Sequence, residues 1–531
     1  MTDLIDASGG DGSRYAGRFM QPVRAFVMAV CVSVLTACSG LPSLAGRPES
    51  QALRHTEDTR LGRAVASVIG DRRDVAGIHT LGEGRAAFAS RVLLADTAER
   101  SLDVQYYIWH DDMSGTLMLD ALVRAAQRGV RVRLLLDDNG VAGLDETLAV
   151  LDADPNIEVR LFNPFQLRRF RSLNYLTDFS RLNRRMHNKS MTADNQATII
   201  GGRNIADEYF DVSDTMSFAD LDVMAIGPVV QEVSADFDRY WASQSAYPVR
   251  GLLPDATGDA ARRWAERVAA VRASPEAARY RQALEESQFV RELTTNSLRF
   301  EWAATRMISD DPAKGLGQAD DARMMPTLLR ETLGKPTRDL TLVSSYFVPT
   351  ATGVTAFGNM AKDGVAVTIL TNSLEATDVA VVHAGYAKHR KTLLEHGVHL
   401  YEMKRNSPDS RGGGSNSLMG SSASSLHAKT FSVDGQRVFI GSYNFDPRSA
   451  KLNTEMGFVI DSPAMAQNMA RVLAERMPAA AYTVTLSPDG DLRWLEQTDA
   501  GLRVHDSEPG TNFLQRMGIR ALSLLPIEWL L

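Results

Sequence analysis

Cysteine is nearly absent from this chain of 531 residues: it has only Cys31 and Cys38, and neither has a partner in the body of the chain. A disulfide framework and a cysteine-based zinc site are therefore excluded. The chain also lacks an excess of positive charge, because 58 Lys and Arg residues against 65 Asp and Glu residues give a net charge of −7. Nothing in the overall charge favours nucleic-acid binding.

Long hydrophobic runs are scarce as well. The clearest run, 25–35, is too short to span a membrane comfortably, but with Arg24 before it the run has the length of a signal-peptide core. It ends in Leu-Thr-Ala-Cys-Ser, which resembles a bacterial lipobox with Cys38 as the lipidated residue. An ordinary signal peptide and an uncleaved anchor are the alternatives. Residues 1–19 carry three aspartates and look unlike the start of a signal peptide, so we expect translation to begin at Met20.

A lipidated Cys38 predicts a protein anchored to a bacterial membrane and facing the periplasm. The sequence leaves open whether this is the inner or the outer membrane. No second segment of transmembrane length follows.

The body of the chain repeats one order of elements. In each half a strand rich in β-branched and aromatic residues is followed by a stretch of helical spacing, a buried strand and a third strand. The corresponding segments are 101–109, 115–129, 130–138 and 157–163 in the first half and 339–349, 352–364, 365–373 and 398–404 in the second. This order predicts an α/β fold of two related halves, each with a mixed, largely parallel sheet flanked by helices.

The predicted segments follow from this repeat. They are a leader (1–38), a tether and N-terminal extension (39–80), the first half (81–257), a helical connection (258–335), the second half (336–475) and a C-terminal extension (476–531).

Two copies of one motif carry the chemistry. Each reads His-x-Lys, four residues, then Asp, and each is followed by Gly-x-x-Asn. On a strand, residues i and i+2 share a face, so each histidine projects beside its lysine, a pairing that suits a phosphate group. Two halves packed about a pseudo-twofold axis would bring the histidines together, and phosphodiester exchange needs both a nucleophile and an acid. The motif residues are His187, Lys189, Asp194, Gly201 and Asn204, and His427, Lys429, Asp434, Gly441 and Asn444.

The paired motif resembles the phospholipase D superfamily, over roughly residues 80–460. Within it, phrases such as GVRVRLLLDDNG, GSYNFDPRSAKLNTEMG and the C-terminal LPIEWLL resemble bacterial C-type cardiolipin synthases. This resemblance implies the two-half fold, with the active site at the interface between the halves.

The resemblance also implies a mechanism. One histidine attacks phosphorus and forms a phosphohistidine, while the other protonates the leaving alkoxide; His187 is the favoured nucleophile and His427 the acid and base. Lys189, Lys429, Asn204 and Asn444 would hold the non-bridging oxygens. A carboxylate from the opposite half would orient each histidine, Asp222 for His427 and Glu455 for His187, with Asp220 as the alternative to Asp222.

Other acidic residues are expected to support the fold. The family counts Asp194 and Asp434 among its catalytic residues, yet their odd spacing from the histidines turns them away from the site, so we expect them to bond backbone at a turn. No cofactor and no metal is expected, because lysines and amides supply the positive field. The acids of His110-Asp111-Asp112 and Asp137-Asp138 are interpreted as rim or capping residues rather than metal ligands.

The substrate follows from context. Residues 166–189 carry six arginines interleaved with apolar side chains, which could lie on anionic headgroups, track a nucleic acid or form a solvated loop. The apolar tail 513–531 could dock on the body or lie on the membrane. We predict phospholipid substrates at a membrane surface: phosphatidylglycerol, with phosphatidylethanolamine as a further candidate, exchanged to form cardiolipin. A hydrolytic phospholipase D is the alternative, and a periplasmic nuclease or an inactive scaffold is more distant.

Overall fold

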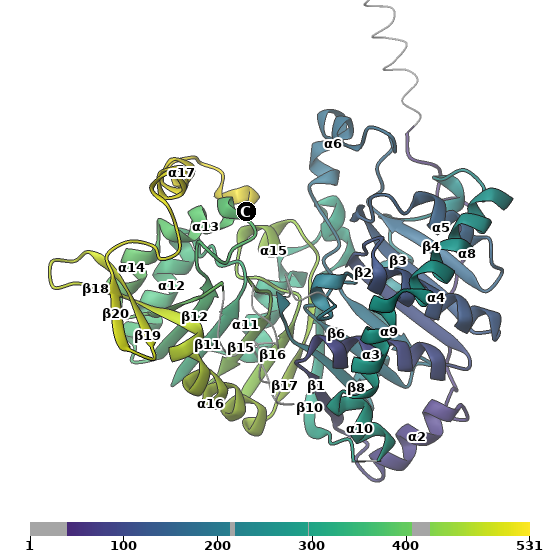
Figure 1. Ribbon diagram of the computed structural model, residues 1–531, viewed down its shortest axis with the longest axis horizontal. Helices are drawn as coiled ribbons and strands as arrows, with labels where there is room; N and C mark the ends of the chain where they lie inside the picture. Colours follow the sequence, from purple (N-terminus) through teal and green to yellow (C-terminus); the bar gives the residue numbers. More distant parts are fainter. Residues whose placement is uncertain (1–39, 213–217, 296, 406–424) are drawn as a thin grey trace, which may run out of the picture.

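The computed structural model describes residues 40–212, 218–295, 297–405 and 425–531. Both histidine motifs lie inside these ranges, whereas the predicted leader and Cys38 lie outside them. Figure 1 shows two α/β halves side by side, the first in purple to teal and the second in green to yellow. The predicted α/β fold of two halves is confirmed.

The first half begins earlier in the chain than predicted, because a strand within 39–80 belongs to its sheet. Its strands are β1 (Ala76–Leu81), β2 (Ser101–Ile108), β3 (Arg131–Gly140), β4 (Ile157–Phe162), β5 (Ser190–Ala193), β6 (Ala197–Gly201), β8 (Asp222–Ile226) and β9 (Ala246–Pro248). Its helices are α2 (Arg60–Ile69), α3 (Gly84–Thr97), α4 (Met113–Gln127), α5 (Asp145–Asp152), α6 (Tyr175–Leu182) and α7 (Val229–Trp241).

The second half repeats this plan, and the C-terminal extension enlarges its sheet. Its strands are β11 (Asp339–Ser344), β12 (Ala366–Asn372), β13 (His399–Met403), β15 (Lys429–Val433), β16 (Arg437–Gly441), β17 (Met456–Asp461), β18 (Ala481–Leu486), β19 (Leu492–Thr498) and β20 (Gly501–His505). Its helices are α12 (Thr350–Lys362), α13 (Ala380–Ala387), α14 (Arg390–Glu395), α15 (Pro447–Lys451), α16 (Pro463–Ala480) and α17 (Phe513–Ser523).

The sheet is mixed, but it is not largely parallel as the sequence had indicated. Parallel pairing is confined to β2-β3-β4 and β11-β12-β13, and the other pairings of the large sheet are antiparallel. The parallel strands are buried between helices: β3 is buried from Val132 to Asp138, with the apolar residues Leu134 to Leu136 at its centre. Helix α4 covers this part of the sheet and begins at Asp112, whose carboxylate accepts a hydrogen bond from the Gly115 backbone at 2.8 Å.

The connection between the halves contains a strand that the helix-rich sequence of 258–335 did not indicate. After α8 (Gly258–Ala273), α9 (Pro275–Glu285) and α10 (Gln288–Thr294), β10 (Glu301–Ser309) precedes α11 (Met325–Leu333). The first residues of β10 pair with β1, and the remaining ones pair with β17 of the second half. One sheet of 18 strands therefore runs through both halves.

Candidate active site

The two motifs meet because short stretches of each half pair with the other. Met186 forms a bridge with Thr454, and the His187 backbone N–H donates to the Thr454 carbonyl at 2.9 Å. In the other half β14 (Ser425–Leu426) pairs with β7 (Phe218–Ala219), and the His427 N–H donates to the Ala219 carbonyl at 2.7 Å. Each histidine is thus held beside a segment of the opposite half.

Glu455 orients His187, and this contact was predicted. Its Oε2 lies 2.8 Å from the Nδ1 of His187. The same carboxylate accepts hydrogen bonds from Ser442 at 2.5 Å and from Ser449 at 2.8 Å. Burial raises the pKa of Glu455 to about 7, even though Lys189 and the two serines favour its charged form.

Asp220 orients His427. The sequence had favoured Asp222 for this role, with Asp220 as the alternative, and the structure supports Asp220. The Asp220 Oδ2 lies 2.6 Å from the His427 Nδ1. Burial raises the pKa of Asp220, but the charge and hydrogen bond of His427, with Lys429 and Arg203, outweigh burial and lower it. Asp222 instead binds Arg91 at 2.8 Å inside its own half.

The register of the sheet explains the exchange of roles. Gly201 pairs with Asp222 in the first half, and Gly441 pairs with Gly457 in the second. Asp222 therefore occupies the position of Gly457, and the residues two places earlier are Asp220 and Glu455. Their sequence contexts, Asp-Leu-Asp-Val and Glu-Met-Gly-Phe, contain this signal, but counting from the histidines does not show it, because the two intervening loops differ in length.

The two lysines lie in the same buried centre. Lys189 Nζ donates to the carbonyl of His187 at 2.7 Å, and Lys429 Nζ lies 2.9 Å from Nδ1 and 3.1 Å from Nε2 of His427. Burial lowers the pKa of Lys189 to about 7 and that of Lys429 to about 8. Burial, Lys189 and Lys429 also hold the pKa of His187 well below its usual value, so this ring is neutral at physiological pH.

Both predicted asparagines are buried near this centre. The carbonyl of the Asn204 side chain accepts from the Ile108 N–H at 3.2 Å, and its amide donates to the Tyr209 hydroxyl at 2.9 Å. Asn444 Oδ1 accepts from the Ser345 hydroxyl at 2.9 Å. Their predicted contact with phosphate stays a prediction.

Two tyrosines that the motif did not reveal pack against the histidines. Tyr107 meets the His187 ring edge to face at 5.0 Å, and Tyr209 meets the His427 ring in the same way at 5.1 Å. Tyr107 also lies 5.5 Å from the Lys189 ammonium group. Its position at the end of a strand rich in aromatic residues was visible in the sequence, but a contact with histidine was not.

Comparison with known proteins places this site in a family. A family model described as "Cardiolipin synthase, PLD-like domain" matches residues 93–241 and 329–477, once in each half. Cardiolipin synthase C of Escherichia coli is 49% identical over 472 residues, which cover 89% of this chain and 100% of that protein. The chain belongs to the phospholipase D-like family of cardiolipin synthase type. The two-histidine mechanism is general to this family.

Other relatives agree with the fold. An uncharacterized protein of Helicobacter pylori strain 26695 is 30% identical over 509 residues, covering 93% of this chain and 97% of its own. The crystal structure of phosphatidylserine synthase from Haemophilus influenzae superposes with a TM-score of 0.54 at 14% identity, covering 88% of this chain and 100% of that one. This second likeness concerns the fold alone.

The motif aspartates of this phospholipase D-like chain bond backbone, as their spacing had indicated, and their catalytic role stays a prediction. Asp194 is buried and accepts hydrogen bonds from the backbone N–H groups of Glu99, Arg100 and Ser101 at 2.8 to 3.2 Å. Asp434 binds the equivalent segment, Thr337–Asp339. Both aspartates lie at hairpin turns and have positive φ angles. Each follows its histidine by seven residues, which at roughly 3.3 Å per residue places it about 20 Å along the strand.

The remaining acidic residues are used in the fold. Asp137 forms an ion pair with Arg185 at 2.7 Å. His110, Asp112 and Glu208 have side-chain ligand atoms within 4.8 Å of one another. Asp112 is at the same time the N-cap of α4 and accepts from the Asp207 N–H at 2.8 Å, which accounts for its position without a metal.

The exchange of Asp222 for Asp220 gives a paired test. Asp220→Asn should lower kcat by about 10²- to 10⁴-fold in the folded enzyme, because it removes the charge that supports His427. Asp222→Asn should reduce the free energy of unfolding by about 3 kcal/mol, because the buried Arg91 loses its counter-charge. Urea unfolding and steady-state kinetics below the unfolding transition separate the two effects. The assignment fails if folded Asp222→Asn loses turnover while Asp220→Asn keeps it.

The motif aspartates are tested by stability. Asp194→Ala should cost about 3 kcal/mol, because it leaves several buried backbone N–H groups without an acceptor. Asp434→Ala should cost less, because its site is closer to solvent. Thermal unfolding measures both variants. Loss of turnover in a fully folded Asp194→Ala protein would support a catalytic role.

Proposed function

We propose that this protein is a phosphatidyl transferase that forms cardiolipin from phosphatidylglycerol and a second phospholipid. The observation that carries the proposal is the pair of histidines at the joint between the halves, each with its Nδ1 held by a carboxylate of the opposite half. The family match and the 49% identity to a cardiolipin synthase support the choice of reaction.

The first half of the reaction breaks the bond between phosphorus and the glycerol headgroup. The Nε2 lone pair of neutral His187 attacks phosphorus, a P–N bond forms, and the leaving alkoxide takes the proton of His427. In the second half a hydroxyl of the acceptor lipid returns its proton to His427 and attacks phosphorus, so that the P–N bond breaks. The products are glycerol and cardiolipin, and both histidines recover their starting states.

The unequal carboxylates support this assignment of roles. Burial raises the pKa of Glu455 to about 7, so the partner of His187 carries only part of a negative charge at neutral pH. Burial and Lys429 lower the pKa of His427, but Asp220, whose own pKa lies below its usual value, opposes that shift. The pKa of His187 is held well below its usual value, so His427 is the ring that holds a proton more readily. A neutral ring is the better nucleophile, and a protonated ring is the acid.

The lysines supply the positive field for the phosphate. Lys189 and Lys429 approach the centre from the two halves, which allows them to bind the two non-bridging oxygens as negative charge gathers there. Asn204 and Asn444 are proposed to add neutral donors. This arrangement does not require a metal.

Phospholipids as substrates imply work at a membrane surface. Within the part of the chain that the structure describes, no helix is both long and apolar enough to cross a membrane. We propose attachment through a lipid on Cys38, with the enzyme facing the periplasm. Phosphatidylethanolamine is proposed as a second partner lipid.

Lipid analysis tests the reaction. Purified enzyme with radiolabelled phosphatidylglycerol vesicles, with and without phosphatidylethanolamine, should give cardiolipin. His187→Ala and His427→Ala should each lose about 10³-fold or more in rate, because each removes a group that acts on the reacting atoms. His505→Ala, on β20, is the matched control and should retain activity. Phosphatidic acid as the sole product would identify a hydrolase, and DNA cleavage without a lipid product would overturn the proposal.

The roles of the two histidines can be separated with a phosphatidyl ester of p-nitrophenol, whose leaving group needs no acid. His427→Ala should then release one equivalent of nitrophenol and retain an acid-labile phosphatidyl group on His187. Retention of that group in His187→Ala would reverse the assignment.

The lysine pKa values predict the alkaline limb of activity. As pH rises through about 7 and 8, the free enzyme loses the charges of Lys189 and Lys429, and because both are needed kcat/KM should fall about 50-fold between pH 8 and pH 9. Bound phosphate favours the charged lysines, so the decline in kcat should begin at higher pH. Lys189→Arg keeps its charge and should remove the contribution that titrates near pH 7. A kcat/KM that is constant from pH 7 to 9.5 would contradict this model.

A further inference from the structure

Two surfaces of this molecule expose large apolar side chains. The first, which we call the α6 patch, lies on the segment that leads to His187, where Leu176 is 83% exposed. Its residues are Leu167, Phe170, Leu173, Leu176 and Phe179. Contiguous exposed apolar side chains of this kind mark interaction sites.

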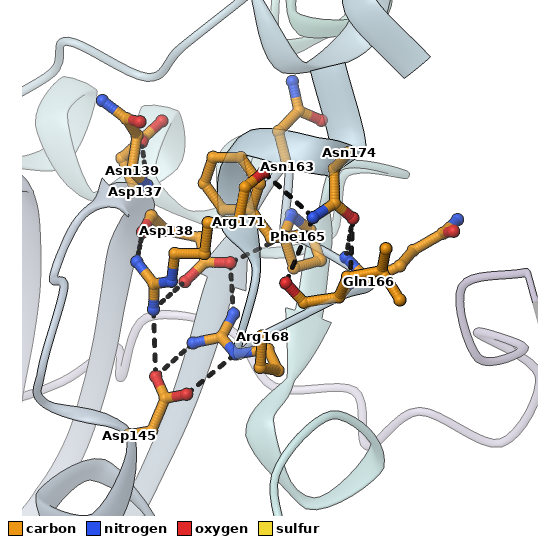
Figure 2. Close-up of polar contacts among 12 residues, drawn as sticks. Asp137, Asp138, Asn139, Asp145, Asn163, Phe165, Gln166, Arg168, Arg171 and Asn174 are labelled. Carbon is orange, nitrogen blue, oxygen red and sulfur yellow. Dashed lines mark hydrogen bonds and ion pairs between the residues drawn. The ribbon is translucent and has the colours of Figure 1, made fainter. Parts of the chain in front are cut away.

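Four of the six arginines of the same segment form ion pairs with acidic residues of the body or of the segment itself. Arg168 forms ion pairs with Asp138 and Asp145, and Arg171 lies 3.1 Å from Asp145 (Figure 2). The Asn174 side chain closes the loop that contains both arginines, because its Oδ1 accepts hydrogen bonds from the N–H groups of Gln166 and Leu167 at 2.9 and 2.8 Å.

Two further arginines are neutralised in the same way. Arg181 pairs with Asp178 at 2.6 Å, and Arg185 pairs with Asp137. Most of the positive charge of 166–189 therefore fixes the segment to the body, while Arg169 and the apolar side chains face solvent.

The second surface, the α17 patch, belongs to the C-terminal extension. Ile519 and Leu531 are buried against the body, whereas Leu514 and Leu524 are 77% and 85% exposed. The patch consists of Phe513, Leu514, Met517, Leu524, Leu525 and Trp529. The predicted docking of 513–531 thus holds for part of the segment only, since its other face is apolar and uncovered.

Arg448 ties the two surfaces together. Its guanidinium donates to the Asn183 carbonyl at 3.1 Å and side chain at 2.6 Å, directly after α6, and to the carbonyl of Leu530 at 3.1 Å. The next residue, Ser449, donates to Glu455, the partner of His187. The ends of both segments are therefore fixed to the helix that supports the catalytic carboxylate.

Each segment is also linked by side-chain contacts to tyrosines of its own half. Tyr175 of α6 lies 3.5 Å from Asn139, which in turn interacts with the Tyr107 hydroxyl beside His187. In the second half, Leu531 packs with Val348 in a cluster that contacts Tyr346. Figure 1 shows α6, α17 and the purple start of the described chain on the same side of the molecule.

We propose that the α6 and α17 patches insert together into the interface of a phospholipid bilayer and thereby hold the catalytic site over the lipid headgroups. The proposal rests on the proposed function, because a lipid phosphodiester must reach the buried histidines from the membrane surface. Since four of the arginines are paired internally, apolar burial provides the main part of the attachment, with Trp529 suited to the headgroup level. Arg169 and Arg520 are exposed, so anionic lipid adds a smaller contribution that salt screens.

Site-specific depth measurements test the surface. The full chain with Cys31→Ser and Cys38→Ser receives one new cysteine, Leu176→Cys or Leu514→Cys, labelled with an environment-sensitive fluorophore. On phosphatidylcholine vesicles that carry doxyl-labelled chains, both labels should be quenched, equally at 50 mM and 500 mM NaCl. Glu475→Cys on α16, which lies away from α6 and α17 in Figure 1, is the control and should not be quenched.

Kinetics separate this surface from the reaction itself. Leu176→Ser combined with Leu514→Ser should lower turnover of vesicle phosphatidylglycerol about tenfold but leave turnover of monomeric, short-chain phosphatidylglycerol unchanged. If the unaltered enzyme turns over neither substrate, the proposed function fails. Equal turnover of vesicles by variant and unaltered enzyme, or absence of quenching at both labels, overturns the docking surface. If the protein forms a concentration-dependent dimer in which both labels are shielded without vesicles, the patches bind a second copy of the chain. That result also overturns the membrane docking surface.

Discussion

The exchange of carboxylates between the halves is the constraint on which this structure depends. A buried imidazole beside buried ammonium groups is costly unless a carboxylate compensates it, and here that carboxylate comes from the other half in both cases. Neither half is therefore a complete site. The short pairings of Met186 with Thr454 and of β14 with β7 carry the connection, so the same backbone contacts that join the halves also set the tautomer of each ring.

The continuous sheet gives this connection its precision. Because β10 pairs first with β1 and then with β17, the two halves share one hydrogen-bonded frame and cannot slide by a residue without reversing the faces of a strand. Glu455 directly precedes β17, and Asp220 lies two residues before the start of β8, so both carboxylates are positioned by strands next to this joint. The distance between them and their histidines is thus fixed by sheet register rather than by flexible loops.

Sequence patterns predicted those parts of the molecule that short-range rules determine. The spacing His-x-Lys identified the two histidines and the two lysines of the site, and the repeated order of elements indicated two α/β halves. Glu455 could be predicted because it lies a short distance after the second motif. Asp220 and Asp222 could not be distinguished, because only the pairing of Gly201 with Asp222 in the sheet reveals their register. The strand β10 was missed because helices surround it in the chain. The sequence also could not show that arginines of 166–189 are paired, because their partners Asp137, Asp138 and Asp145 precede this segment by many residues.

In the proposed reaction the two lysines bind the phosphate, and their burial sets the charge that they carry before substrate arrives. Burial lowers the pKa of Lys189 to about 7, and Glu455, also near 7, stands beside it in the same pocket. Such groups can exchange a proton at little cost, so the empty site need not hold uncompensated charges away from water. An arriving phosphodiester brings its own negative charge, favours the charged lysines and draws protons into the pocket. Charge in this site is therefore assembled by the substrate, while the outer apolar surfaces are free to face lipid.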